Sequence, residues 1–342
     1  MNYMNNENEV VLLDKLSIDQ QIRVYKQAFN NPLEESELRA RWEKKHYNNP
    51  CGNSLIFGVF INGELAGMNA YMPYSFNYNG VNIKCLQSCE SGVPHRFQGR
   101  GIWGKIVRYA VEYVFANTDY EFIFGFPNYR NSYPGFVKMK WSTVGQMNNY
   151  LMINNASNFI KSLSTNRFLT LFSFPLTSQR LIVKVLSSRK LDIEECPSED
   201  LLWQDRQDMV IVKPSIQWVN WKQDYKGQYF VSVKNKERII ATCIYGIETY
   251  NNQSYIRIDR ISIVNNPNIG NKTIIATIVK HLSEKYPKIA FFRVWAIDGD
   301  DMNKLYKKLF FLKTAHPNPL IIKAPDEKYN EVKWQLSFYD LD

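Results

Sequence analysis

The sequence predicts an α/β (α+β) protein with two domains, each built on a mixed, mostly antiparallel sheet flanked by helices. Three observations support this prediction. The chain has 342 residues, which exceeds the size of a typical single domain. A meander of three apolar strands precedes a helix and a fourth strand, and the second half repeats that order. The 45% hydrophobic and 22% charged composition is typical of a folded globular protein.

Two helices are expected at the start of the chain. Ser17-x-x-Gln20 has the pattern of a capping box before the segment IRVYKQAF. Asn31, followed by Pro32 and Glu34, indicates a second helix start before LRARWEKKHY.

A three-stranded meander follows these helices. Its first strand, SLIFGVFI, ends at Asn62-Gly63, and its second, ELAGMNAYMPYSF, ends near Asn79-Gly80. Asn-Gly between apolar runs predicts a type I′ hairpin turn, because both residues accept the positive φ angles that this turn requires.

The third strand leads into a glycine loop within residues 86–104, LQSCESGVPHRFQGRGIWG. A helix follows, because the apolar residues at a spacing of four share one face: Ile102, Ile106, Ala110 and Val114. A glycine turn that opens a helix leaves backbone N–H groups unpaired at the positive end of the helix dipole, where phosphate binds. Tight turns also need glycine for steric reasons alone, so the loop by itself leaves both interpretations open.

The order of residues in this loop resembles a known family. Val93 followed by Arg96-x-x-Gly99-x-Gly101 resembles the acyl-coenzyme A loop of the GNAT acyltransferases. After a strand expected at residues 120–126, the segment GFPNYRNSYPGFVKMKW resembles the second cofactor motif of that superfamily. More narrowly, the FPN-x-x-NS element is similar to two-domain (tandem GNAT) bacterial proteins linked to surface polysaccharide synthesis.

The resemblance implies that acetyl-CoA is a cosubstrate and that no metal takes part. The backbone of Val93 would bond the pantetheine arm, and Arg96 and Arg100 would add positive charge near the pyrophosphate. Asn128 would lie beside the thioester. The pyrophosphate would be held by the backbone amides of Gln98, Gly99, Arg100, Gly101, Ile102 and Trp103.

Two residues depart from the family pattern. Phe136 stands five residues before Trp141, where many GNAT proteins have a general-acid tyrosine, and a phenyl ring has no proton to donate. Lys140 replaces the usual glycine.

The candidate catalytic residues follow from the chemistry of acyl transfer to an amine, which requires removal of a proton. Glu90 is the leading base, because its strand is expected to end beside the thioester, although a surface carboxylate is an equally weighted interpretation. We expect partial burial to raise its pKa. Tyr133 is the nearest substitute for the missing acid, and the C-terminal carboxylate of Asp342 is a further candidate base.

The second half is expected to be a GNAT-like domain that has lost its phosphate loop. Val264 follows Val93 by 171 residues, and at the same offset Lys272 and Pro267 take the positions of Gly101 and Arg96. The expected division is an N-terminal domain at 1–155, a basic helical connector at 156–195 and a C-terminal domain at 196–342. The C-terminal domain would be a scaffold or a pocket wall, and its tryptophans would line that wall or belong to the core: Trp218, Trp221, Trp295 and Trp334.

Net charge and targeting signals bound the partners and the location. The whole excess of +9 falls between Phe122 and Leu191, a stretch without Asp or Glu. It predicts a positive surface for an anionic partner such as a sugar nucleotide, a lipid-linked saccharide or a membrane, and no specific nucleic acid is expected. The start of the chain lacks a signal-peptide pattern, and no apolar run reaches the roughly 18 residues that span a bilayer, so a cytoplasmic location is expected.

Together these features predict an acyl-CoA-dependent N-acyltransferase that acetylates a primary amine, with an amino sugar or a sugar nucleotide as the candidate acceptor. A catalytically inactive acyl-CoA sensor or assembly partner is the first alternative, favoured by Phe136. An aminoacyl transferase of the Fem type is the second, and the intact glycine loop argues against it. The sequence leaves the acyl chain, the acceptor and the oligomeric state open.

Overall fold

The computed structural model describes residues 8–163, 183–188, 190–203, 208–212, 215–264, 268–314 and 317–340. The chain divides into two compact units, and neither is a continuous stretch of sequence. Unit 1 comprises Met1–Gly145 and Asn318–Val332, and unit 2 comprises Gln146–Pro317 and Lys333–Asp342. This division differs from the expected contiguous domains with boundaries at residues 155 and 195.

Unit 1 contains a mixed, mostly antiparallel sheet, as predicted. Its strands lie in the order β1 (Val10–Leu13), β2 (Leu55–Ile61), β3 (Glu64–Tyr78), β4 (Val81–Gly92), β5 (Phe122–Gly125) and β14 (Asn318–Lys323). Only the β4–β5 pair in this order is parallel. Both predicted hairpin turns are confirmed, since φ is +52° and +74° at Asn62 and Gly63 and +53° and +79° at Asn79 and Gly80.

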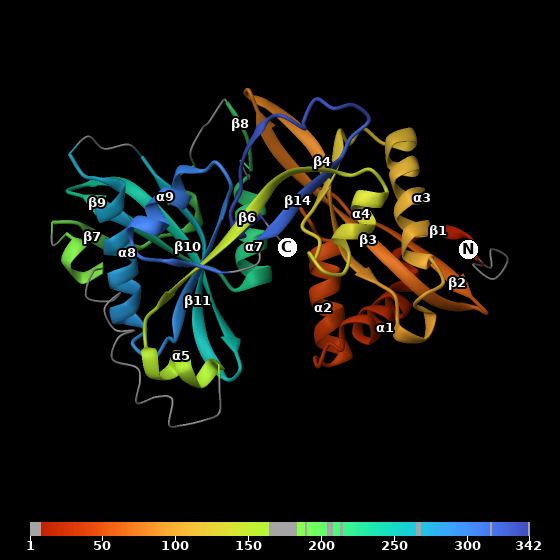
Figure 1. Cartoon of the computed structure of the whole chain (residues 1–342), viewed down its shortest axis with the longest axis horizontal. Coiled ribbons are helices and arrows are strands. Elements are labelled where there is room, and N and C mark those ends of the chain that lie inside the picture. Colours follow the sequence, from red (N-terminus) through yellow and green to blue (C-terminus); the bar gives the residue numbers. More distant parts are fainter. Residues whose placement is uncertain are drawn as a thin grey trace. The chain divides into compact units, whose positions relative to one another are not determined.

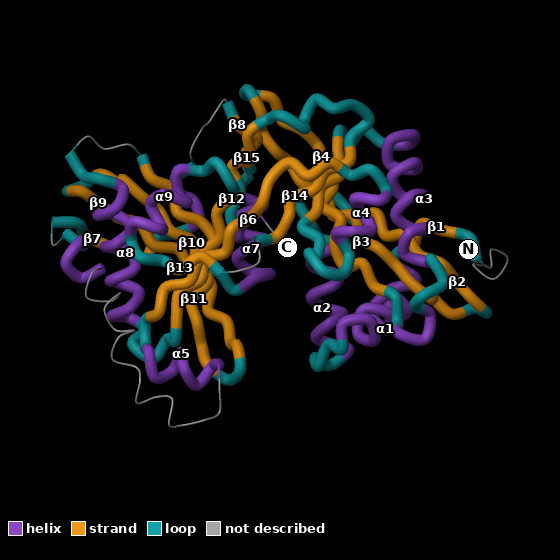
Figure 2. The backbone as a smooth tube through the Cα atoms, in the orientation of Figure 1, coloured by secondary structure: helices purple, strands orange, loops and turns teal. Residues whose placement is uncertain are grey.

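Helices cover both faces of this sheet (Figures 1 and 2). The helices α1 (Ile18–Phe29) and α2 (Glu35–His46) pack on the face that carries Ile56 and Phe60. The helix α3 (Ile102–Asn117) packs on the face that carries Phe57 and Val59, and its predicted apolar stripe is buried there. Alternate residues of β2 therefore belong to two separate cores.

The expected capping box at the start of α1 does not form. Ser17 ends a short 3-10 turn, so its hydroxyl donates to the carbonyl oxygen of Asp14 at 2.8 Å. The same hydroxyl accepts from the amide nitrogen of Gln21, not Gln20, at 2.9 Å. Gln21 also accepts from the indole nitrogen of Trp42 at 2.8 Å, which joins α1 to α2.

Unit 2 repeats the fold of unit 1. Its sheet has the order β6 (Ser142–Ile153), β12 (Phe291–Ile297), β11 (Gln253–Ile263), β10 (Arg238–Tyr250), β9 (Tyr229–Asn235) and β7 (Asp192–Glu195). Its helices include α5 (Ala156–Leu163), α7 (Ile216–Lys226), α8 (Asn271–Lys285) and α9 (Asp301–Lys308). The parallel pair β11–β12 begins at Ile256 and corresponds to β4–β5, which begins at Cys85, 171 residues earlier.

Each sheet is completed by a strand from the other half of the sequence. The strand β6 follows the short helix α4 (Tyr133–Lys138) of unit 1 but pairs with β12, where Asn149 lies opposite Trp295. The strand β14 pairs with β5, where Ile321 lies opposite Gly125. This exchange explains the difference from the expected boundaries, because such pairings leave no local sequence pattern.

The expected connector at 156–195 is described only in part. Its first residues form α5 and its last form β7, which pairs with β9 in the sheet of unit 2. Residues 164–182, which hold much of the predicted helical connector, lie outside the described residues.

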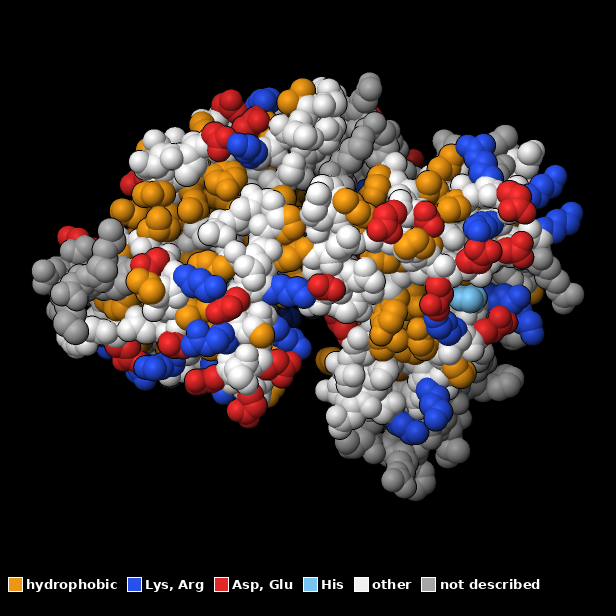
Figure 3. Space-filling model, turned by 180° about the vertical axis from the view of Figure 1, so that it is seen from behind, with side chains coloured by type: hydrophobic (Ala, Val, Ile, Leu, Met, Phe, Trp, Pro, Cys, Tyr) orange, Lys and Arg blue, Asp and Glu red, His pale blue; other side chains and the backbone are white. Residues whose placement is uncertain are grey.

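Two observations concern the surface. No helix in the described part of the chain is long and apolar enough to cross a membrane. On the face that Figure 3 shows, the coloured Lys and Arg side chains lie among Asp and Glu side chains, so the charge excess is not concentrated there.

Candidate active site

The glycine loop needs glycine for its backbone angles. A short 3-10 turn (His95–Phe97) leads to Gly99, with φ of +77°, and to Gly101, with φ of +72°, which is the N-cap of α3. A Cβ atom at either position would meet no atom within 4 Å. The left-handed backbone, and not crowding, therefore requires these glycines.

The loop and the first turn of α3 present a row of unpaired backbone amides. In the ranges that the structure describes, no protein acceptor is bonded to the amides of Gly99, Arg100, Gly101, Ile102 and Trp103. They lie at the positive end of the α3 dipole, so this junction has the donors that an oxyanion such as pyrophosphate requires.

Gln98 does not belong to this row, which corrects the sequence-based assignment. Its amide donates to the carbonyl oxygen of His95 at 3.1 Å, because the 3-10 turn continues one residue further than expected. Its side-chain nitrogen donates to the carbonyl oxygen of Val93 at 3.0 Å.

Both loop arginines lie close to the ring of Phe97. The guanidinium carbons of Arg96 and Arg100 are 4.9 and 5.6 Å from its centroid. Arg96 also forms an ion pair with Glu64. Part of the charge expected to help bind phosphate is therefore already compensated at Arg96.

The strands β4 and β5 pair over only three residues. Their register ends at Gln87 opposite Phe124, whereas β4 continues to Gly92. A bulge on the other side of β4, where the register with β3 shifts, places Glu90 in a left-handed conformation with φ of +43°. The end of β4 is thus separated from β5, as a ligand lying between the two strands requires.

Polar side chains surround this separation. Asn69 is fully buried and donates to the hydroxyl of Ser88 at 3.1 Å. Its carbonyl oxygen accepts from the hydroxyl of Ser91 at 2.5 Å. Asn69 thereby links the two sides of the bulge.

Glu90 is buried and ionised. Its side chain is 13% exposed and forms an ion pair with Lys45 of α2, and one of its oxygens lies 3.6 Å from Nε2 of His46. Burial raises the pKa of this carboxyl, but the charges of Lys45 and then of His46 outweigh burial and lower it to about 2. The expected rise in this pKa is wrong, because sequence spacing does not show that Lys45 lies beside Glu90.

His46 supports the same cluster in its neutral form. Burial, with a smaller contribution from Lys45, lowers its pKa to about 3, although Glu90 acts in the opposite direction. Its Nδ1 lies 2.9 Å from the hydroxyl of Ser54. The residues Lys45 and His46 escaped sequence analysis because cations in the last turn of a helix are common and normally interact with the helix dipole.

The segment after β5 holds the remaining candidates. Asn128 is exposed, and its side-chain oxygen accepts from the backbone amides of Arg130 and Asn131 at 3.0 and 3.3 Å, so it stabilises its own turn. The hydroxyl of Tyr133 lies 3.0 Å from that of Thr143. Asp342, the alternative base, lies outside the described residues.

The two departures from the family pattern have clear structural settings. Phe136 is 4% exposed, and its ring centroid lies 4.9 Å from that of Trp103 and 4.8 Å from that of Trp141. Lys140 has φ of +58°, the left-handed conformation that glycine adopts without strain.

The corresponding helix of unit 2 starts differently. Gly270 is the N-cap of α8 with φ of −67°, and its carbonyl oxygen accepts from the amide of Thr273 at 2.9 Å. Pro267 lies outside the described residues.

Comparison with known proteins agrees with this geometry. Residues 9–143, less than half of the chain, match the family model described as an acetyltransferase (GNAT) domain. A search of curated proteins gives no match.

Similar solved structures extend over almost the whole chain. A probable N-acyltransferase from Enterococcus faecalis V583 has 13% identity and a TM-score of 0.66, with 94% of this chain and 74% of that chain covered. A GCN5-related N-acetyltransferase from Anabaena variabilis has 10% identity and a TM-score of 0.63, with the same coverage. A tandem GNAT protein from the clavulanic acid biosynthesis pathway has 9% identity and a TM-score of 0.59, with 93% and 98% covered. At such identities the likeness shows the fold, which includes two GNAT-like units.

Proposed function

We propose that the GNAT-type acetyltransferase domain formed by residues 9–143 transfers an acetyl group from acetyl-CoA to the nitrogen of a primary amine. The observation that carries this proposal is the row of five unpaired amides from Gly99 to Trp103, beside the separated end of β4. Bound acetyl-CoA would supply the thioester that the amine attacks.

Residues of unit 1 would hold and orient the cosubstrate. The five amides fit the pyrophosphate, and Arg100 adds a positive charge next to them. Val93 follows the separated end of β4, where its backbone would contact the pantetheine arm.

The proposal assigns proton transfer differently from the sequence-based expectation. Glu90, with a pKa of about 2, is too weak a base to take a proton efficiently at neutral pH. As a fixed carboxylate it would instead stabilise the positive charge that develops on the attacking nitrogen. We assign proton donation to the departing sulfur to the Tyr133 hydroxyl, which Thr143 orients at 3.0 Å.

For the acceptor we propose an anionic amino sugar, carried by a nucleotide or a lipid during polysaccharide synthesis in the cytoplasm. Support comes from the exposed cations that follow β5 in unit 1, namely Arg130, Lys138 and Lys140. Exposed charges of this kind attract an anionic substrate over roughly 10 Å at 0.1 M salt.

A second candidate function is acetyl-CoA binding without catalysis. The buried phenyl ring of Phe136 favours it, because the residue that supplies an acid in many GNAT proteins is here a part of the core.

A thiol-release assay with acetyl-CoA separates the two functions. The acceptor panel contains a free amino sugar, a nucleotide-linked amino sugar and a simple alkylamine, and acetyl-CoA binding is measured in parallel by calorimetry. Turnover with an amino sugar supports the transferase. Binding without turnover on any amine favours the second candidate, and absence of binding contradicts both.

A further inference from the structure

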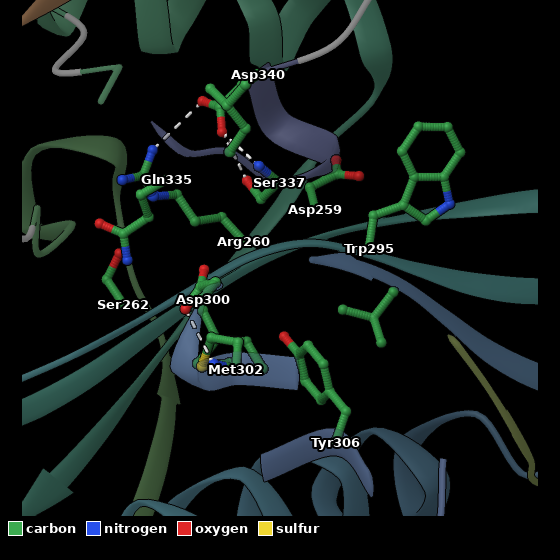
Figure 4. A pocket seen from close by; sticks show the side chains of 13 residues that line it. Asp259, Arg260, Ser262, Trp295, Asp300, Met302, Tyr306, Gln335, Ser337 and Asp340 are labelled. Atoms are coloured by element: carbon green, nitrogen blue, oxygen red, sulfur yellow. Dashed lines mark hydrogen bonds and ion pairs between the residues drawn. The ribbon is translucent and has the colours of Figure 1, made fainter. Parts of the chain in front are cut away.

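Unit 2 has a cavity where its central parallel strands separate. The register of β11 and β12 ends at Ile258 opposite Val294, and β11 continues to Ile263. A cavity of about 30 Å³ lies at this point, lined by residues of both strands, of the start of α9 and of the C-terminal segment (Figure 4). Its position in the second sheet corresponds to the β4–β5 separation of the first.

A buried guanidinium lines this cavity without using most of its donors. Arg260 is 7% exposed. Its hydrogen bonds within the described ranges both come from Nη1, to the carbonyl oxygen of Val212 at 3.3 Å and to a carboxylate oxygen of Asp340 at 3.4 Å. Buried N–H groups without an acceptor are costly, so the cavity favours an occupant with an acceptor oxygen.

Two further donors line the same cavity. The indole Nε1 of Trp295 is buried and has no hydrogen-bond partner. Tyr306 is 3% exposed, and no described residue bonds its hydroxyl. Figure 4 shows this hydroxyl pointing from α9 towards the strands. The strands and α9 thus supply three unspent donor groups.

The carboxylates around the cavity already have partners. Asp259 accepts from Arg257 at 2.9 Å and from Gln228 at 2.5 Å. Asp340 accepts from the amide and the hydroxyl of Ser337 at 2.7 and 2.9 Å. These acids leave the three donors without an acceptor of their own.

The charges of this cluster balance. Three acids (Asp259, Asp300 and Asp340) lie in or beside the cavity, together with three cations (Arg257, Arg260 and Lys222). An anionic occupant would add an uncompensated buried charge, whereas a neutral one would not.

We propose that this cavity binds the carbonyl oxygen of a small uncharged amide. A volume of about 30 Å³ exceeds the ~10–15 Å³ that one water requires, so a carbonyl group with a small substituent fits. Arg260, Trp295 and Tyr306 would donate to its oxygen. The inference concerns unit 2 alone and does not depend on acetyl transfer by unit 1.

The experiment is a titration of the full chain, labelled with ¹⁵N at tryptophan, with acetamide, acetate and methylammonium. The indole signal of Trp295 is identified with Trp295→Phe. Acetamide should shift this signal saturably and at lower concentration than acetate, and methylammonium should not shift it. A stronger response to acetate or to methylammonium would overturn the proposal, as would the absence of saturation with acetamide.

Variants test which donors bind. Arg260→Met should weaken acetamide binding at least tenfold, whereas Arg238→Met, an exposed arginine of β10, should leave it unchanged. If Arg260→Met does not fold, Tyr306→Phe keeps the ring and removes only the hydroxyl, and binding should weaken severalfold. Unchanged binding in the folded Arg260 and Tyr306 variants would refute the assignment.

Discussion

The ammonium of Lys45 pairs with the carboxylate of Glu90, and their side chains are only 5% and 13% exposed. This pair joins the end of α2 to the β4 bulge, where β4 separates from β5. Removing one partner of such a pair leaves a buried, uncompensated charge.

Lys45→Met should therefore raise the pKa of Glu90 from about 2 to above its ordinary value of 4.5, because burial is no longer opposed by the lysine. At neutral pH the variant should lose about 3–5 kcal/mol of stability. Carboxyl ¹³C NMR of labelled glutamate, assigned with Glu90→Gln, measures the pKa. The control is Lys44→Met in the same helix. A Glu90 pKa that stays near 2 without Lys45 would show that other donors hold the charge.

The same pair predicts how stability depends on pH. A folded-state pKa of about 2, below the ordinary 4.5, contributes stability that is complete above pH 4.5 and is lost as pH falls towards 2. The contribution is on the order of 3 kcal/mol. Urea unfolding between pH 6 and 2 should show a shallower loss in Glu90→Gln than in the natural chain. Parallel curves for the two proteins would contradict this assignment.

Local sequence chemistry predicted the parts of the fold that depend on neighbouring residues. The turns at Asn62-Gly63 and Asn79-Gly80 have the predicted positive φ angles, and the glycines of the loop have theirs. The repeat of 171 residues also located β11 correctly. These features follow from residues that are adjacent in sequence or from a regular offset.

The unpredicted features depend on contacts between distant residues. The pairing of β14 with β5 joins segments about 200 residues apart, and Lys45 reaches Glu90 from another helix. The bond from the Gln98 amide to His95 depends on where a 3-10 turn ends, which sequence patterns place only within a few residues.

Gly101→Val tests the phosphate site. Valine is strained at φ of +72°, so the backbone should shift and move the unpaired amides, and acetyl-CoA binding should fall by at least tenfold. The matched control is Gly80→Val, which carries similar strain at φ of +79° in the β3–β4 turn. Calorimetry with acetyl-CoA measures both variants. Equal affinity in the two would remove the loop from the binding site.

Lys140→Gly should stabilise the protein. A left-handed residue other than glycine costs about 1–2 kcal/mol, whereas glycine adds only about 0.5–1 kcal/mol of unfolded-state entropy. The expected net gain is about 0.5–1 kcal/mol in urea unfolding. Lys138→Gly, in helix α4, should instead destabilise by about 1 kcal/mol. A loss of stability in Lys140→Gly would mean that its side chain contributes more than its backbone costs.

The strand exchange predicts that residues 1–145 do not form a stable unit alone. Without β14, the β5 edge loses its ladder with Ile321–Lys323, and the buried Leu320, Ile321 and Ile322 no longer cover it. A fragment of residues 1–145 should therefore unfold at lower urea than the same fragment joined by a flexible linker to residues 318–332. Ile321→Asp in the joined fragment should remove the gain, because a buried carboxylate without a partner is costly. Equal unfolding midpoints for the short and joined fragments would show that β14 is dispensable for the first unit.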